Sequence, residues 1–219
     1  MPITKHSTSP DRHFHSKGCT LQTKRTALTP EREAKIRRVL GLRQKDLTLV
    51  LANIHDPHNV SAIYRSCDAF GVPCVHLYYT DTAFPVLGAK SSASARKWVR
   101  TIRHKDMDSL ISTLRGEGMK LYATSCTPQA KALGELDLTL PTAIIMGNEH
   151  RGVDPEFARH MDGEVYIPMY GMIQSFNVSV AAAVLLAEAS RQRRAAGKYD
   201  SPTYSDEELA ALYTEWSQK

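Results

Sequence analysis

The chain has 219 residues, of which 42% are hydrophobic and 23% are charged. This composition supports a buried core and excludes a chain that is disordered throughout. The 28 basic and 23 acidic side chains give a net charge of +5, which excludes an acidic solvating protein and favours an anionic partner.

The four cysteines form no C-x-x-C pair, which argues against a disulfide scaffold or a cysteine-based zinc site. This usage fits a reducing, cytoplasmic location. The first thirty residues lack an apolar secretory core, and the longest apolar stretch, 178–187, is too short to span a bilayer. We therefore expect no secretory leader and no membrane partner.

The positive charge is concentrated at the N-terminus, where residues 1–46 hold eleven basic and four acidic side chains. Residues 1–28 are polar and without apolar periodicity, which predicts a disordered extension. A hydroxyl cap at Thr29 followed by proline predicts a helix over 29–46. Its basic residues recur at helical spacing, and this stripe is either an RNA contact or an ordinary solvated face. They are Arg32, Lys35, Arg38 and Arg43.

From residue 47 onward, short apolar runs alternate with helical patterns, which predicts an α/β domain over 47–196 with a mostly parallel sheet and helices on both faces. Flanking helices precede it and follow it, the latter in a tail over 197–219. The predicted strands are 47–53, 74–79, 98–102, 119–124, 142–147 and 164–168. The predicted helices are 58–70, 106–116, 154–161, 176–196 and 205–217.

Three polar segments follow strands, at the edge where open α/β sheets bind ligands. In the first, 55–71, we expect His58 or Asn59 to cap a helix. Arg65 lies less than two turns beyond Asn59 among small and apolar neighbours, where an arginine is unusual without an anion. Arg65 either pairs with a local carboxylate such as Asp68 or meets an anionic ligand.

The second segment, 144–154, ends a strand at Gly147 and carries Glu149 between two glycines. Glycine lets the backbone approach a ligand closely. Glu149 is therefore either a ligand or dimer contact or a plain surface acid.

The third segment, 164–194, leads through a Met/Gly loop to Ser175 and Asn177 at the start of an alanine-rich helix. Small side chains suit a crowded interior or a subunit interface. The helix ends in Arg191, Arg193 and Arg194, which complement its dipole and are also compatible with a phosphate contact.

Phosphate-loop and dinucleotide fingerprints are absent from the sequence, which disfavours an ordinary nucleotide hydrolase or dinucleotide oxidoreductase. Instead, the three segments together resemble the motifs of the SpoU branch of the SPOUT RNA methyltransferases, over roughly residues 30–200. The resemblance is strongest to the tRNA (guanosine-18-2′-O)-methyltransferase family. It implies a trefoil knot within about residues 140–195, S-adenosyl-L-methionine as methyl donor, a tRNA ribose 2′-hydroxyl as acceptor, and a homodimer.

The resemblance also implies roles for individual residues. Catalysis falls to Asn59, Arg65, Glu149, Ser175 and Asn177. The cofactor is lined by Thr124, Gly147, Ile167, Met169 and Phe176, the last of which is often leucine in the family. RNA contacts fall to Arg32, Lys35, Arg43, His58, Arg115, Arg191 and Arg193. No metal ion is required.

The resemblance gives Arg65 the task of removing the hydroxyl proton with the help of an RNA phosphate. A guanidinium is a poor base, so the alternative is that Arg65 orients the phosphate and polarises the hydroxyl. Three other functions remain: a ribosomal RNA methyltransferase of the same family, a noncatalytic knotted RNA-binding protein, and a structural α/β protein. The short N-terminal region favours tRNA over ribosomal RNA.

Overall fold

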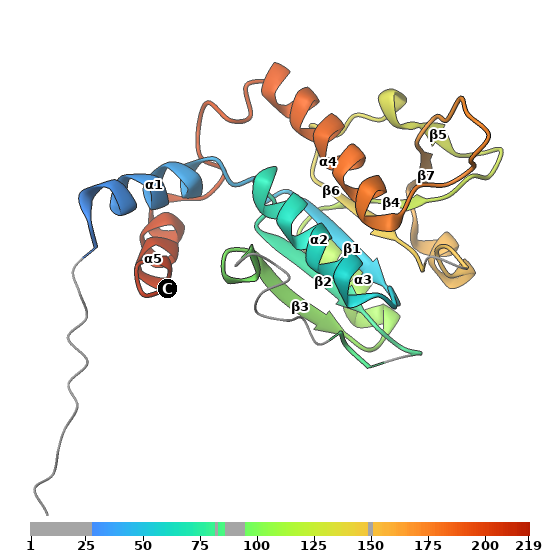
Figure 1. Cartoon of the computed structure of the whole chain (residues 1–219), viewed down its shortest axis with the longest axis horizontal. Coiled ribbons are helices and arrows are strands. Elements are labelled where there is room, and N and C mark those ends of the chain that lie inside the picture. Colours follow the sequence, from blue (N-terminus) through green and yellow to red (C-terminus); the bar gives the residue numbers. More distant parts are fainter. Residues whose placement is uncertain (1–27, 82, 86–94, 149–150) are drawn as a thin grey trace, which may run out of the picture.

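The sheet of this protein has seven strands, all parallel, in the order β3-β2-β1-β6-β4-β7-β5 (Figure 1). The computed structural model describes residues 28–81, 83–85, 95–148 and 151–219. The strands are β1 Leu47–Ala52, β2 Cys74–Tyr78, β3 Arg100–His104, β4 Lys120–Thr124, β5 Lys131–Ala132, β6 Thr142–Met146 and β7 Gly163–Tyr166. The predicted α/β class with a parallel sheet is confirmed.

Helices cover both faces of this sheet and build a core on each. The helices are α1 Pro30–Gly41, α2 Pro57–Ala69, α3 Met107–Gly116, α4 Val178–Ala195 and α5 Asp206–Trp216, with short 3₁₀ turns η1 Ala95–Lys97, η2 Leu133–Glu135 and η3 Pro155–His160. Helices α2 and α4 lie side by side over one face (Figure 1) and bury the larger core. Helix α3 and η3 bury the other. The central strands β1 and β6 are buried along their whole length, as parallel strands covered on both faces should be.

Three predicted elements differ from those observed. The run predicted as a strand over 98–102 pairs over Arg100–His104, because residues 95–97 form η1 beside α2. The pattern at 154–161 forms the 3₁₀ turn η3. The cap of α2 is Asp56, whose carboxylate accepts from the His58 amide at 2.8 Å because Pro57 takes the first helical position. The side chains of His58 and Asn59 are thereby not needed for capping.

Helices α1 and α5 pack together to one side of the sheet (Figure 1). Their shared apolar cluster centres on Ile36, Leu40 and Trp216 and includes Trp98 of the main domain. As predicted, Thr29 caps α1. The basic N-terminal helix and the C-terminal helix therefore form one unit, although more than 160 residues separate them in the sequence.

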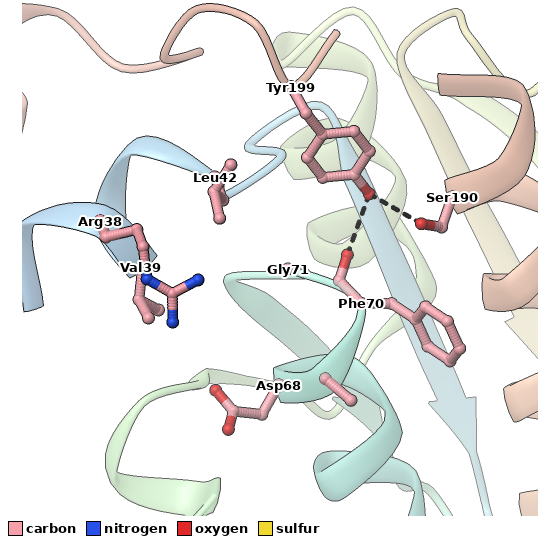
Figure 2. A pocket seen from close by; sticks show the side chains of 9 residues that line it. Arg38, Val39, Leu42, Asp68, Phe70, Gly71, Ser190 and Tyr199 are labelled. Carbon is pink, nitrogen blue, oxygen red and sulfur yellow. Dashed lines mark hydrogen bonds between the residues drawn. The ribbon is translucent and has the colours of Figure 1, made fainter. Parts of the chain in front are cut away.

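A junction at the C-terminal ends of α2 and α4 joins this unit to the main domain (Figure 2). The Tyr199 hydroxyl donates to the Phe70 carbonyl and reaches the Ser190 hydroxyl, both at 3.3 Å. Gly71 turns the chain at φ +79°, and a Cβ there would lie 2.9 Å from a backbone oxygen of Leu42, so only glycine fits. A pocket of about 250 Å³ lies here, at the C-terminal ends of α2 and α4.

Within the described ranges, no helix combines the length and the apolar character needed to cross a bilayer.

Candidate functional site

The first polar segment leaves β1 through an unusual turn at Asn53. Its φ is +50°, a left-handed conformation that asparagine tolerates better than most residues. The buried Asn53 side chain accepts from the Thr80 amide at 3.0 Å and donates to the Thr80 hydroxyl at 3.1 Å. These two hydrogen bonds hold the carboxyl ends of β1 and β2 together.

The first and third segments meet at the N-terminal ends of α2 and α4. Asn177 caps α4 by accepting from the Ser179 amide at 2.8 Å and the Ser179 hydroxyl at 2.7 Å. Its Nδ2 donates to Oδ1 of Asn59 on α2 at 3.0 Å. One hydrogen bond thus joins residues 118 positions apart, and it brings the N-termini of α2 and α4 next to each other.

The second segment is tied to the first through Asn148. Asn148 and Gly152 exchange two backbone hydrogen bonds of 2.9 Å, which closes a tight loop after β6. A Cβ on Gly147 would lie 2.0 Å from Gly152, so the loop requires glycine there. The buried Asn148 side chain donates to the Asn53 carbonyl at 2.8 Å and lies 3.2 Å from a ring nitrogen of His55.

Arg65 lies on the exposed side of α2, one and two-thirds turns beyond Asn59. Among the described residues it forms no ion pair, because Asp68 instead binds the guanidinium of Arg43. The pairing of Arg65 with Asp68 that the sequence left open is therefore not made. An exposed guanidinium in this position is available to an anionic ligand.

The residues expected to line a cofactor follow three neighbouring strands. Thr124 ends β4, Gly147 follows β6 and Ile167 follows β7, and β4 pairs with both of the other strands. The Thr124 hydroxyl donates to the Ile145 carbonyl at 3.1 Å. Ile167 and Met169 are half-buried, and Phe176 is 38% exposed. Parallel strands end at one edge, so Thr124, Gly147 and Ile167 lie along a single rim, and Met169 and Phe176 follow in the loop between β7 and α4.

An ion pair lies at the same edge of the sheet, between the residues after β6 and those after β2. Arg151, beyond the Asn148 loop, binds the carboxylate of Asp81, which follows β2. This hydrogen bond, followed by that from Thr80, lowers the pKa of Asp81. Within the described part of the chain, no three His, Cys, Asp or Glu side chains are placed to hold a metal ion.

A family model for the SpoU rRNA methylase family matches residues 46–187. The chain belongs to this family. The tRNA (guanosine(18)-2′-O)-methyltransferase of Thermus thermophilus is 42% identical over 87% of this chain and 98% of its own length. The crystal structure of the Aquifex aeolicus TrmH/SpoU tRNA modifying enzyme superposes with a TM-score of 0.80 at 36% identity, covering 86% of this chain and 95% of that one. An AdoMet-bound rRNA methyltransferase from Sinorhizobium meliloti matches at 25% identity and a TM-score of 0.59, covering 71% and 59%.

Two arginines expected to contact RNA in this SpoU protein are instead buried. Arg43 is 1% exposed, pairs with Asp68 and donates to the Val72 carbonyl at 3.2 Å. Arg193 is fully buried, pairs with Asp46 and donates to backbone carbonyls at the base of β6. Their role is to hold α1 and α4 to the domain, which corrects the prediction. Charge spacing does not distinguish a cation facing solvent from one buried with a partner.

The other expected RNA contacts lie on the surface. Arg32 and Lys35 are exposed on α1, and His58 is exposed at the start of α2. Arg191 is exposed and pairs with a neighbouring glutamate, whereas Arg115 is occupied by Asp162 and two carbonyls.

One expected catalytic residue, Ser175, is exposed in the loop before α4 and is not part of the hydrogen-bonded cluster. Another, Glu149, lies outside the described residues. Two residues that hold the site, Asn53 and Asn148, were not predicted. An asparagine at a strand end was the signal in each case, since asparagine tolerates left-handed turns and its amide both donates and accepts.

Proposed function

We propose that this chain transfers a methyl group from S-adenosyl-L-methionine to the ribose 2′-hydroxyl of guanosine 18 in tRNA. The observation that carries the proposal is the hydrogen bond from Asn177 to Asn59. It joins the third segment to the first at the start of α2, the helix on which Arg65 is exposed. Similarity to tRNA enzymes along nearly their whole length supports tRNA over ribosomal RNA as the substrate.

The rim formed by β4, β6 and β7 suits the cofactor. The half-buried apolar side chains of Ile167 and Met169 and the backbone at Gly147 together offer groups that suit a flat adenine ring. Thr124 and Phe176 complete this wall. When bound, S-adenosyl-L-methionine supplies a methyl group on a positively charged sulfur, which is already activated for transfer. The AdoMet-bound relative supports this assignment.

In this mechanism the chain mainly positions the acceptor. Arg65 would hold an RNA phosphate and polarise the 2′-hydroxyl. The hydroxyl oxygen would bond to the methyl carbon as the carbon–sulfur bond breaks, and its proton would pass to that phosphate or to water. Asn177 and Asn59 fix the two helix N-termini beside it. Ser175 and Glu149 are the further candidates for contact with the ribose.

We also propose the trefoil knot of the SPOUT fold within residues 140–195. Its support is that β6 inserts between β1 and β4, while the chain after β7 returns to place α4 against α2. The flanking helices, within 29–46 and 197–219, would serve RNA binding from the outside through Arg32 and Lys35. We place the protein in the cytoplasm, as its cysteine usage indicates.

A homodimer is proposed because the loop between β7 and α4 presents apolar side chains to solvent. Tyr170 is 98% exposed and Met172 99%. Contiguous exposed apolar surface of this kind marks an interaction site. The loop also carries cofactor positions, so a second copy would complete the site.

The test is incubation of the purified protein with labelled S-adenosyl-L-methionine and unmodified tRNA, followed by nucleoside analysis. The expected product is 2′-O-methylguanosine at position 18, lost in Arg65→Ala and kept in Arg159→Ala, a matched control at an exposed arginine on η3. Label entering only ribosomal RNA would support the sister activity. Cofactor binding without transfer to either RNA would support a noncatalytic RNA-binding protein.

A further inference from the structure

A second cavity, of about 640 Å³, lies between α5 and the N-terminal ends of β1, β2 and β3. Its wall includes Trp98 and Trp216, which are the two tryptophans of the chain, and Tyr204. The two indole rings lie 4.8 Å apart at 53°. A volume of this size and an aromatic wall are typical of sites for flat organic ligands.

This cavity is separate from the rim proposed for methyl transfer. Thr48, Cys74 and Arg100, in its wall, stand at the first or second position of their strands, whereas the rim lies at the carboxyl ends. A five-residue strand spans about 17 Å at about 3.3 Å per residue. A ligand here would not occupy the reaction centre.

Most charged side chains of the wall form ion pairs with other described residues. The two that do not are one hydrogen-bond donor, an arginine, and one acceptor, a glutamate. Lys45 binds Glu208 and Lys219 binds Glu215. Arg100 and Glu117, by contrast, form no ion pair with any other described residue. Both line this cavity together with Cys74, which begins β2.

A buried hydrogen-bond donor without a partner also indicates a ligand in this cavity. Arg43 lines the cavity at 1% exposure, its guanidinium 5.1 Å from the Trp216 ring centroid. Its Nε is the single buried side-chain nitrogen or oxygen in the described segments without a hydrogen-bond partner. Buried donors are almost always satisfied by protein, ligand or ordered water, so the Nε of Arg43 is the open position in this wall for an acceptor.

We propose that this cavity binds an unpaired guanine nucleotide. Guanine offers O6 and N7 to an arginine fork, for which Arg100 is available, and its N1–H and N2–H groups suit the Glu117 carboxylate. Unpaired bases stack on aromatic side chains such as Trp98. The source is either a loop base of the RNA substrate, which rests on the proposed function, or a free mononucleotide.

Tryptophan fluorescence measures occupancy directly because both tryptophans line this cavity. Titration with guanosine 5′-monophosphate, corrected for absorption with free N-acetyltryptophanamide, is expected to give saturable quenching. Arg100→Ala should weaken the affinity by between about 5-fold and about 150-fold, as for loss of a bidentate arginine–guanine pair. Arg103→Ala, an exposed arginine of the same strand on the opposite sheet face, should leave it unchanged.

Inosine 5′-monophosphate, which lacks the N2 amine, tests the role of the carboxylate. The wild type should prefer guanosine to inosine monophosphate, and Glu117→Gln should lose this preference. Absence of saturable quenching, or equal affinities of Arg100→Ala and Arg103→Ala, would overturn the proposal.

Unmodified tRNA distinguishes the two sources. Quenching by tRNA that Arg100→Ala weakens assigns the cavity to RNA, whereas quenching by mononucleotide alone assigns it to a free nucleotide. Neither measurement requires methyl transfer, so failure of the proposed function leaves this test intact. Urea unfolding midpoints of all variants establish that each one is folded.

Discussion

At residue 177, one asparagine side chain performs two tasks that substitution can separate. Asn177 caps α4 through Ser179 and donates to Asn59. Serine is also a good cap but is too short to reach Asn59. For Asn177→Ser we therefore expect a free energy of unfolding within about 0.5 kcal/mol of wild type. The value of kcat/KM should fall about 2- to 13-fold, the equivalent of one net hydrogen bond.

The alanine variant is the control for this prediction. Asn177→Ala loses the cap as well, so urea unfolding should show a loss of about 1 kcal/mol together with the loss of activity. Full activity of the serine variant would contradict a role for the bond to Asn59.

A second residue-scale prediction concerns His76, which is buried with its Nδ1 3.0 Å from Nε2 of His104. Burial, followed by the nearby His104 and Arg100, lowers the pKa of His76 from 6.5 to about 4. Between those two values the unfolded chain binds a proton that the folded chain does not. Stability is therefore greatest above pH 6.5 and falls as the pH drops towards 4.

The size of this effect is measurable by urea unfolding at pH 7.5 and pH 5.0. The shift is equivalent to about 3 kcal/mol in total, of which about 2 kcal/mol is lost between these two pH values. His76→Gln stays neutral, so its free energy of unfolding should depend less on pH by about that amount. Equal pH dependence in both proteins would show that His76 is not the responsible group.

At the scale of elements, apolar patterns predicted the buried strands of the core, but they did not predict the short elements correctly. The strands β1 and β6 were predicted because both of their faces are apolar, which follows from burial between two helical layers. The strand β5 has two residues and leaves no periodicity to detect. The turn η3 has the composition of a helix, but it is only six residues long, Pro155–His160, and its geometry is 3₁₀.

Pairing of α1 with α5 is another feature that no local pattern specifies, and it yields a prediction. Trp216 is 6% exposed and packs on Ile36 and Leu40 of α1. Truncating a buried tryptophan costs about 3–5 kcal/mol. We expect a loss of this size to separate the two short helices α1 and α5. We expect Trp216→Ala to reduce the helical circular dichroism signal and weaken tRNA binding while leaving cofactor affinity unchanged. Thr214→Ala, at an exposed position of α5, is the control.

For the molecule as a whole, the candidate site shows why residue types were predictable and their arrangement was not. The three segments all lie at strand ends, a position that the β/α alternation fixes. The bond from Asn177 to Asn59 depends on α4 packing beside α2, which is a tertiary contact. Arg43 and Arg193 read as surface cations in sequence, and only the fold reveals that Asp68 and Asp46 neutralise them.

The exposed loop between β7 and α4 gives the last prediction. Met172 is 99% exposed in the single chain, so it contributes nothing to the core of that chain. If this loop is covered by a second copy, a charge there must be desolvated on association, at a cost of several kcal/mol. We expect sedimentation equilibrium to show a wild-type dimer and a monomeric Met172→Asp variant, which keeps the wild-type far-ultraviolet circular dichroism spectrum and shows no methyl transfer. Leu140→Asp, at an apolar residue 46% exposed outside this loop, should remain dimeric and active. A Met172→Asp protein that stays dimeric, or an active wild-type monomer, would mean that each chain completes its own site.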